Sequence, residues 1–128
     1  MKRVFLSFRA EDKKQVDGLR LLAANPRFDI EFYDESVQVP FNSTNAEYIK
    51  RKIREKISRT SVTVCLLSPE TYTSQWVAWE LEESYKKSNT VIFMGLPSVT
   101  TSLRLPDPGR QRNAVWYLWD INTLSQMV

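Results

Sequence analysis

The sequence contains no histidine, and this absence narrows the chemistry open to the protein. Ser-His and Cys-His nucleophile pairs, imidazole proton shuttles and most zinc sites are excluded, because each depends on a histidine side chain. Any acid-base or charge-stabilising chemistry has to use Asp, Glu, Lys, Arg, Tyr or Ser. We therefore expect carboxylates as the reactive groups, and no metal site.

Cysteine and glycine are also scarce. Cys65 is the only cysteine, so a disulfide within the chain is excluded, and its place in the apolar run 62–67 predicts a buried, inert thiol. The three glycines form neither a G-x-G-x-x-G pattern nor a Walker loop, the two best-known backbone cradles for phosphate. A phosphate-bearing ligand would need arginines or the N-terminus of a helix.

Long apolar runs are absent as well. No stretch of the sequence approaches the roughly 20 apolar residues that a membrane helix needs. Arg9, Glu11 and Asp12 follow the N-terminus too soon for a signal peptide. We therefore expect a cytoplasmic protein with no membrane partner.

Much of the net charge of +3 comes from one predicted helix. Its basic residues are Lys50, Arg51, Lys52, Arg54 and Lys56. Glu47 and Glu55 interrupt this basic run, and aromatic residues for base stacking are sparse there. We interpret the run as a solvated helix face and expect no nucleic-acid partner.

The 128 residues have room for one compact domain, spanning 1–128, in which apolar runs alternate with helical patterns. We predict strands at 4–8, 28–33, 62–67, 91–94 and 115–118, and helices at 12–24, 44–57 and 74–87. The second helix is predicted to start with a capping box of Thr44 and Glu47. The stretch 96–113 is rich in proline and is expected to be mostly irregular, with a short helical turn.

This alternation predicts an α/β fold of three layers with a five-stranded parallel sheet. Five strands in so short a chain match the flavodoxin-like order 2-1-3-4-5. In such sheets, ligands bind at the carboxyl ends of the strands where the crossovers diverge. That rule places Ser7, Phe8 and Arg9 beside Ser68 and the start of the helix at Ser74.

Helix 74–87 carries the carboxylates of interest. Glu82 and Glu83 each have a lysine four residues on, so we interpret both as ordinary surface carboxylates. Glu80 has Trp76 and Ser84 at those spacings and falls at the boundary between the buried and exposed faces. From periodicity alone, a partly exposed glutamate without a catalytic role remains the simpler interpretation.

Trp76 and Trp79 also lie off the predicted core face of this helix. Two interpretations are open for them: a rim or subunit contact, and stacking against a planar base.

Two segments carry a family resemblance. RVFLSFRAED, residues 3–12, resembles the first sequence box of TIR domains, and SVTVCLLSPETYTSQWVAWELEES, residues 61–84, resembles the third-strand and following-helix region of the same family. The spacing W-x-x-x-E from Trp76 to Glu80 is similar to that of the catalytic glutamate in enzymatic TIR domains. The resemblance covers roughly residues 3–95, and the single short domain is similar to the TIR-like proteins of bacterial Thoeris antiphage systems.

The resemblance implies an enzyme that uses NAD as a substrate, without a separate cofactor, to make a nucleotide signal. It gives Glu80 the catalytic role. It also implies an NAD site lined by Phe8, Arg9, Asp34 and Trp76, with polar contacts from Ser7 and Ser74. The implied partners are further copies of the chain and a separate effector protein that senses the product.

The sequence departs from the family pattern in two places, the loop after Asp34, which lacks the common glycine, and the proline-rich segment after Gly95. The product therefore stays open among ADP-ribose, a cyclic isomer and a conjugate. The main alternative is a non-catalytic TIR module that acts by TIR-TIR contacts. A phosphoacceptor receiver domain is disfavoured, because Ser68 and Pro69 follow the third strand where a receiver has its acceptor Asp.

Overall fold

A parallel sheet of five strands runs through the middle of the molecule in the order β2-β1-β3-β4-β5. The computed structural model describes residues 1–34, 39–99 and 102–128. Its strands are β1 (Lys2–Ser7), β2 (Ile30–Tyr33), β3 (Val62–Leu67), β4 (Thr90–Gly95) and β5 (Trp116–Leu118). The predicted flavodoxin-like strand order is confirmed.

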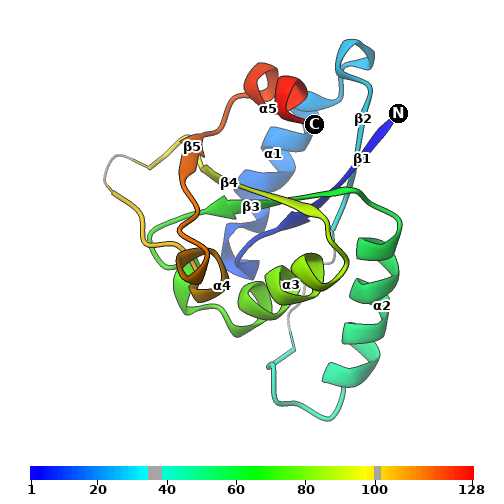
Figure 1. Cartoon of the computed structure of the whole chain (residues 1–128), viewed down its shortest axis with the longest axis vertical. Coiled ribbons are helices and arrows are strands. Elements are labelled where there is room, and N and C mark those ends of the chain that lie inside the picture. Colours follow the sequence, from blue (N-terminus) through cyan, green and yellow to red (C-terminus); the bar gives the residue numbers. More distant parts are fainter. Residues whose placement is uncertain (35–38, 100–101) are drawn as a thin grey trace.

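Helices cover both faces of this sheet, with α1 and α5 on one side and α2, α3 and α4 on the other (Figure 1). They are α1 (Lys13–Ala23), α2 (Ala46–Ser58), α3 (Gln75–Lys86), α4 (Asp107–Gln111) and α5 (Ile121–Met127). Three single turns of 3-10 helix, η1 (Ala10–Asp12), η2 (Pro26–Phe28) and η3 (Thr71–Thr73), lie in the connections.

The two faces of the sheet have separate cores, because side chains alternate along each strand. On the α1 and α5 side, Val4 and Leu6 of β1 pack in one cluster with Val16, Leu19 and Leu124. All six residues of β3 are buried, because helices cover both faces of the sheet at this strand. This burial explains why apolar residues occupy nearly every position of β3 in the sequence.

The opposite face is packed by α2 and α3. Ile53 and Ile57 of α2 cover Phe5 of β1, and Val77 and Leu81 of α3 cover the middle of the sheet. The intervening residues of β1 and β3 therefore point toward these two helices.

Polar side chains also fix α3 to the sheet. The hydroxyls of Thr63 and Ser84 lie 2.7 Å apart, and Ser84 Oγ donates a hydrogen bond to the carbonyl oxygen of Glu80 at 2.9 Å. Both hydroxyl side chains are fully buried, so their hydrogen bonds replace those lost to water. These hydrogen bonds fix the position of α3 along the direction of β3.

The predicted start of the second helix is wrong. Helix α2 begins at Ala46, and its N-cap residue Asn45 makes no capping hydrogen bond through its side chain. The N–H of Ala46 donates to the carbonyl of Ser43 at 3.2 Å, so a backbone turn replaces the predicted capping box. Glu47 instead pairs with Lys50 at 3.7 Å.

The C-terminal helix α5 was not predicted. Asp120 caps it by accepting hydrogen bonds from the N–H groups of Asn122 and Thr123, and Leu124 is buried against the α1 side of the sheet. With seven residues, α5 is too short to show a clear helical period. The short helical turn predicted within 96–113 is confirmed as α4.

Within residues 1–34, 39–99 and 102–128, no helix combines the length and the apolar character that crossing a bilayer requires. The same residues contain no group of three or more acidic or cysteine side chains arranged to hold a metal ion.

Candidate active site

Glu80 is a buried carboxylate. It lies on α3, and only 3% of its surface is exposed, so the prediction of a partly exposed position at the edge of the helix face is wrong. The packing of α3 against the end of β1 covers the side of the helix that periodicity alone leaves open. Since burying an isolated carboxylate is costly, groups that hydrogen-bond to it are expected nearby.

One such group is Ser7, the last residue of β1. Its hydroxyl donates a hydrogen bond to Oε1 of Glu80 at 2.6 Å. The carboxylate therefore lies at the carboxyl end of β1, the edge of the sheet where the fold class predicts a ligand site. A hydrogen bond of this length also fixes the orientation of the Glu80 carboxyl group.

Cys65 is the partner of Ser7 on the neighbouring strand β3. Burial, and to a lesser extent the negative charge of Glu80, raises the pKa of the Cys65 thiol well above its ordinary value. A thiol that stays protonated is a poor nucleophile. The predicted buried position of Cys65 is confirmed, and the raised pKa disfavours a nucleophilic role for its thiol.

Three aromatic rings from α3 and from the chain that precedes α2 contact one another. The ring centroid of Trp76 is 5.0 Å from that of Phe41 and 6.0 Å from that of Trp79, both in edge-to-face geometry. Trp76 Nε1 also donates a hydrogen bond to the carbonyl of Val39 at 2.8 Å. Trp76, one turn before Glu80, therefore ties α3 to the segment that follows β2.

Trp79 has a different environment, because two cations of α2 lie over its ring. Lys50 Nζ is 5.5 Å and the Arg54 guanidinium carbon 5.2 Å from the ring centroid. These contacts make Trp79 part of the packing between α2 and α3. This role differs from both sequence interpretations, a rim or subunit contact and stacking against a planar base.

The loops after β1 and β3 are linked by polar contacts, as their predicted proximity requires. Arg9 pairs with Glu11 at 2.9 Å and with Glu70 at 3.1 Å. Ser68 Oγ donates to Oδ2 of Asp12 at 2.6 Å. Arg9 thus lies at the expected edge of the sheet, with its guanidinium held by two exposed carboxylates.

Ser74 begins α3 near this edge. Its hydroxyl oxygen accepts a hydrogen bond from the N–H of Val77 at 3.2 Å, which is an N-cap contact. The hydroxyl therefore has a structural role, and its predicted contact with NAD stays a prediction.

The side chains of Phe8 and Asp34 lie away from Glu80. Phe8 packs in the core on the α1 side of the sheet, and Asp34 pairs with Arg20 of α1. Asp34 also lines a pocket of 420 Å³ at the β2 edge, and its carbonyl accepts a hydrogen bond from Lys56. Residues 35–38, in the loop noted for its missing glycine, lie outside the described residues. The roles of Phe8 and Asp34 toward NAD stay predictions.

The structure also corrects the interpretation of Glu83 as a surface carboxylate. Its side chain is buried and its Oε1 lies 2.9 Å from Nε of Arg54. Helix α2 covers this side of α3, so the predicted pairing with Lys87 is replaced by one between helices. Glu82 lies 3.7 Å from Arg112 in place of the predicted contact with Lys86. The spacing of charged residues along α3 does not predict either of these ion pairs, because each partner comes from a distant part of the chain.

We expect Ser7→Ala to lower the free energy of unfolding by about 1–2 kcal/mol, because a buried carboxylate loses a hydrogen-bond donor. Urea denaturation measures this change. Ser58→Ala is the matched control, since the exposed Ser58 hydroxyl donates only to the carbonyl of Glu55 on its own helix. Equal losses for the two variants would show that the contact between Ser7 and Glu80 contributes nothing specific.

Comparisons with known proteins bear on this site. The family described as Thoeris protein ThsB, TIR-like domain, matches residues 5–101. A search of curated protein sequences finds no match.

Among solved structures, the TIR domain of the Toll-related receptor TRR-2 from Hydra magnipapillata is similar, with a TM-score of 0.63 and 15% identity over 97% of this chain and 91% of that one. A CMP N-glycosidase from Clostridium botulinum, BcmB, has a TM-score of 0.59 and 14% identity over 98% and 97% of the two chains. A 2-desoxiribosyltransferase from Leishmania mexicana has a TM-score of 0.58 and 16% identity over 74% and 65%. At these identities the structures share the fold.

Proposed function

The chain belongs to the family of Thoeris ThsB TIR-like domains, and on this premise we propose that it cleaves the bond between nicotinamide and ribose in NAD. The observation that carries the proposal is the Glu80 carboxylate, which is buried at the end of β1 and oriented by Ser7. A fixed negative charge in a site shielded from water is what a developing positive charge on the ribose requires.

A single carboxylate is sufficient for this reaction. Ordinary glycoside hydrolysis uses two, one of which protonates a poor leaving group. Nicotinamide in NAD already carries a positive charge and leaves as a neutral base, so no general acid is needed. The remaining task is to stabilise the cationic ribose, and that role falls to Glu80.

The fold supports the proposal in a second way. Two of the similar structures are named for reactions of this general type, a CMP N-glycosidase and an enzyme that transfers a deoxyribosyl group, the 2-desoxiribosyltransferase. The same arrangement of strands is therefore compatible with chemistry of that type. Arg9, at the same edge of the sheet, is proposed to contact the pyrophosphate or a ribose of NAD.

The burial of Glu80 sets a condition on the reaction. With 3% of the residue exposed, NAD reaches the carboxylate only after the groups around it move. Trp76 lies one turn before Glu80 on α3, and its hydrogen bond to the carbonyl of Val39 is one contact that such a movement would change. We propose that self-association of the domain supplies this rearrangement, so that activity depends on assembly.

The proposed product is a cyclic isomer of ADP-ribose or a related nucleotide signal. If the pocket excludes water, the adenine of the same molecule captures the ribose cation, whereas an open pocket gives ADP-ribose. We further propose that a separate effector protein senses the product in the cytoplasm, as part of antiphage defence.

A second candidate is a non-catalytic scaffold that acts through contacts between TIR domains. The observation that favours it is apolar surface: Leu21 and Leu22 of α1 are 79% and 81% exposed, and Leu118 of the edge strand β5 is 59% exposed. Apolar side chains at these positions suit contacts with another protein chain.

Incubation of the purified chain with NAD, with and without a crowding agent that promotes assembly, distinguishes the two candidates. We expect free nicotinamide together with a product that mass spectrometry identifies as ADP-ribose or its cyclic isomer. Size-exclusion chromatography with light scattering reports the assembly state in each sample. An assembled sample that releases no nicotinamide would favour the scaffold.

A further inference from the structure

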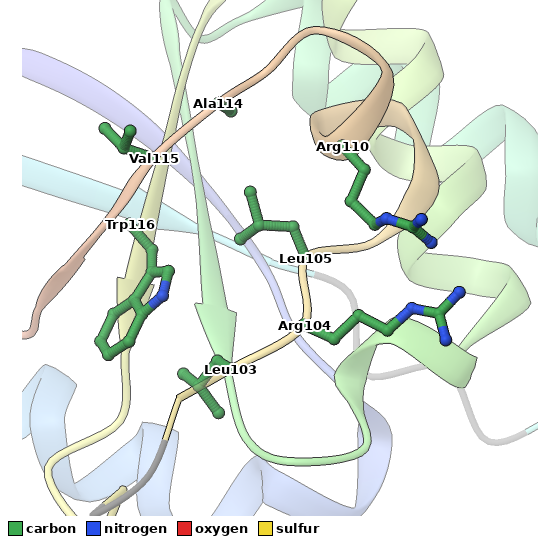
Figure 2. Close-up of a pocket in the computed structure, with 7 residues that line it drawn as sticks. All are labelled: Leu103, Arg104, Leu105, Arg110, Ala114, Val115 and Trp116. Atoms are coloured by element: carbon green, nitrogen blue, oxygen red, sulfur yellow. The ribbon is translucent and has the colours of Figure 1, made fainter.

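A pocket of 480 Å³ lies around α4, at the edge of the sheet formed by β4 and β5. Figure 2 shows the side chains that line it, which come from the segment before α4, from α4 itself and from the chain that enters β5. They are Leu103, Arg104, Leu105, Arg110, Ala114, Val115 and Trp116. None of them belongs to β1 or α3, so this pocket is distinct from the candidate site at Glu80.

Two glycines near the pocket allow close packing against β4. A Cβ at Gly95 would lie 2.9 Å from Cζ3 of Trp116 and 3.2 Å from Cδ1 of Leu103, so both side chains pack directly on the backbone of β4. A Cβ at Gly109 would lie 2.5 Å from Cζ of Phe93, so α4 also sits close to the sheet. The pocket wall is therefore held by packing against β4.

The charged side of the pocket carries two arginines and no acidic residue. Within the part of the chain that the structure describes, Arg104 forms no ion pair, and its guanidinium lies 4.7 Å from the ring centroid of Tyr72. Arg110 contacts Asp107 through Nη1 alone, at 3.2 Å. A guanidinium has five N–H donors, so both arginines keep donors for a ligand.

We propose that this pocket binds an organic phosphate that carries a flat apolar group, a ligand of the nucleotide type. Two guanidinium groups on one pocket match the charge and the several oxygens of a phosphate. Trp116 and the leucines offer an apolar surface for the flat group. The volume of 480 Å³ is within the range of about 300–1,000 Å³ that is usual for small-molecule sites.

Titration calorimetry with AMP as the probe tests the proposal on the full chain. Adenosine lacks the phosphate and inorganic phosphate lacks the flat group, so each should bind at least about tenfold more weakly than AMP. If inorganic phosphate binds as tightly as AMP, the apolar wall has no part and the proposal is wrong. Binding of hexaglutamate without binding of AMP would overturn it in favour of an acidic peptide.

A double variant locates the binding. Arg104→Gln with Arg110→Gln should weaken AMP binding by at least about tenfold, because charge-assisted hydrogen bonds are lost. Arg27→Gln with Arg51→Gln removes the same charge from exposed positions outside the pocket and should change AMP affinity less than about twofold. An equal loss in both double variants, or no loss in the first, contradicts the proposal. Circular dichroism checks that both variants are folded.

Discussion

Replacing Glu80 with glutamine is expected to slow nicotinamide release from NAD by on the order of a thousandfold. Glutamine keeps the size of the side chain and an oxygen that accepts a hydrogen bond from Ser7, and it removes the negative charge. A carboxylate about 4 Å from the ribose cation, at an effective dielectric constant near 20, contributes roughly 4 kcal/mol. That energy corresponds to the expected loss of rate.

The measurement is a steady-state assay of nicotinamide release under the conditions in which the parent chain is most active. Glu82→Gln is the matched control, since Glu82 is a half-exposed carboxylate on the same helix and should leave the rate unchanged. Glu80→Ala should be as inactive as the glutamine variant. If Glu80→Gln consumes NAD within about threefold of the parent rate, Glu80 is not the catalytic group.

Adding one methyl group at Gly109 is expected to lower the free energy of unfolding by about 3 kcal/mol, at the upper end of the usual cost of overpacking. The new Cβ would lie 2.5 Å from Cζ and 2.9 Å from Cε2 of Phe93. Phe93 is 1% exposed, so its ring cannot move outward. Helix α4 then has to lift from the sheet.

Gly18→Ala is the control for this change, and its expected sign is opposite. Gly18 lies inside α1, and a Cβ there would meet nothing within 4 Å. Alanine in a helix interior should therefore stabilise the chain by about 0.5–1 kcal/mol. Urea denaturation of both variants gives the two free energies. A loss at Gly109 no larger than about 0.5 kcal/mol would show that the contact with Phe93 relaxes easily.

The sequence contained most of the information needed for the sheet. Continuous apolar runs predict strands buried on both faces, and β3, which is buried along its whole length, shows why this signal is strong. Once five predicted strands alternate with helices, few strand orders are compatible with the chain length. Boundaries were less accurate, as at α2, where a backbone turn took the place of the expected side-chain cap.

Contacts between distant segments were not predictable in the same way. The burial of Glu80 depends on β1 lying against α3, and that of Glu83 depends on Arg54 of α2, 29 positions away. Helical periodicity describes one helix facing one surface, whereas α3 is covered both by the sheet and by α2. The positions of Ser7, Arg9 and Trp76 followed from the fold class and the family resemblance, and their roles toward NAD are still to be measured.

The hydroxyl that meets Glu80 is available only because Ser7, and not its neighbours Leu6 or Phe8, points to that side of the sheet. Deleting a single residue within β1, with the earlier part of the strand kept in register, would bring Phe8 to this place and remove the hydrogen bond from Ser7. The number of residues between Lys2, where β1 begins, and Ser7 is therefore constrained. Folding and the proposed chemistry are subject to the same constraint there.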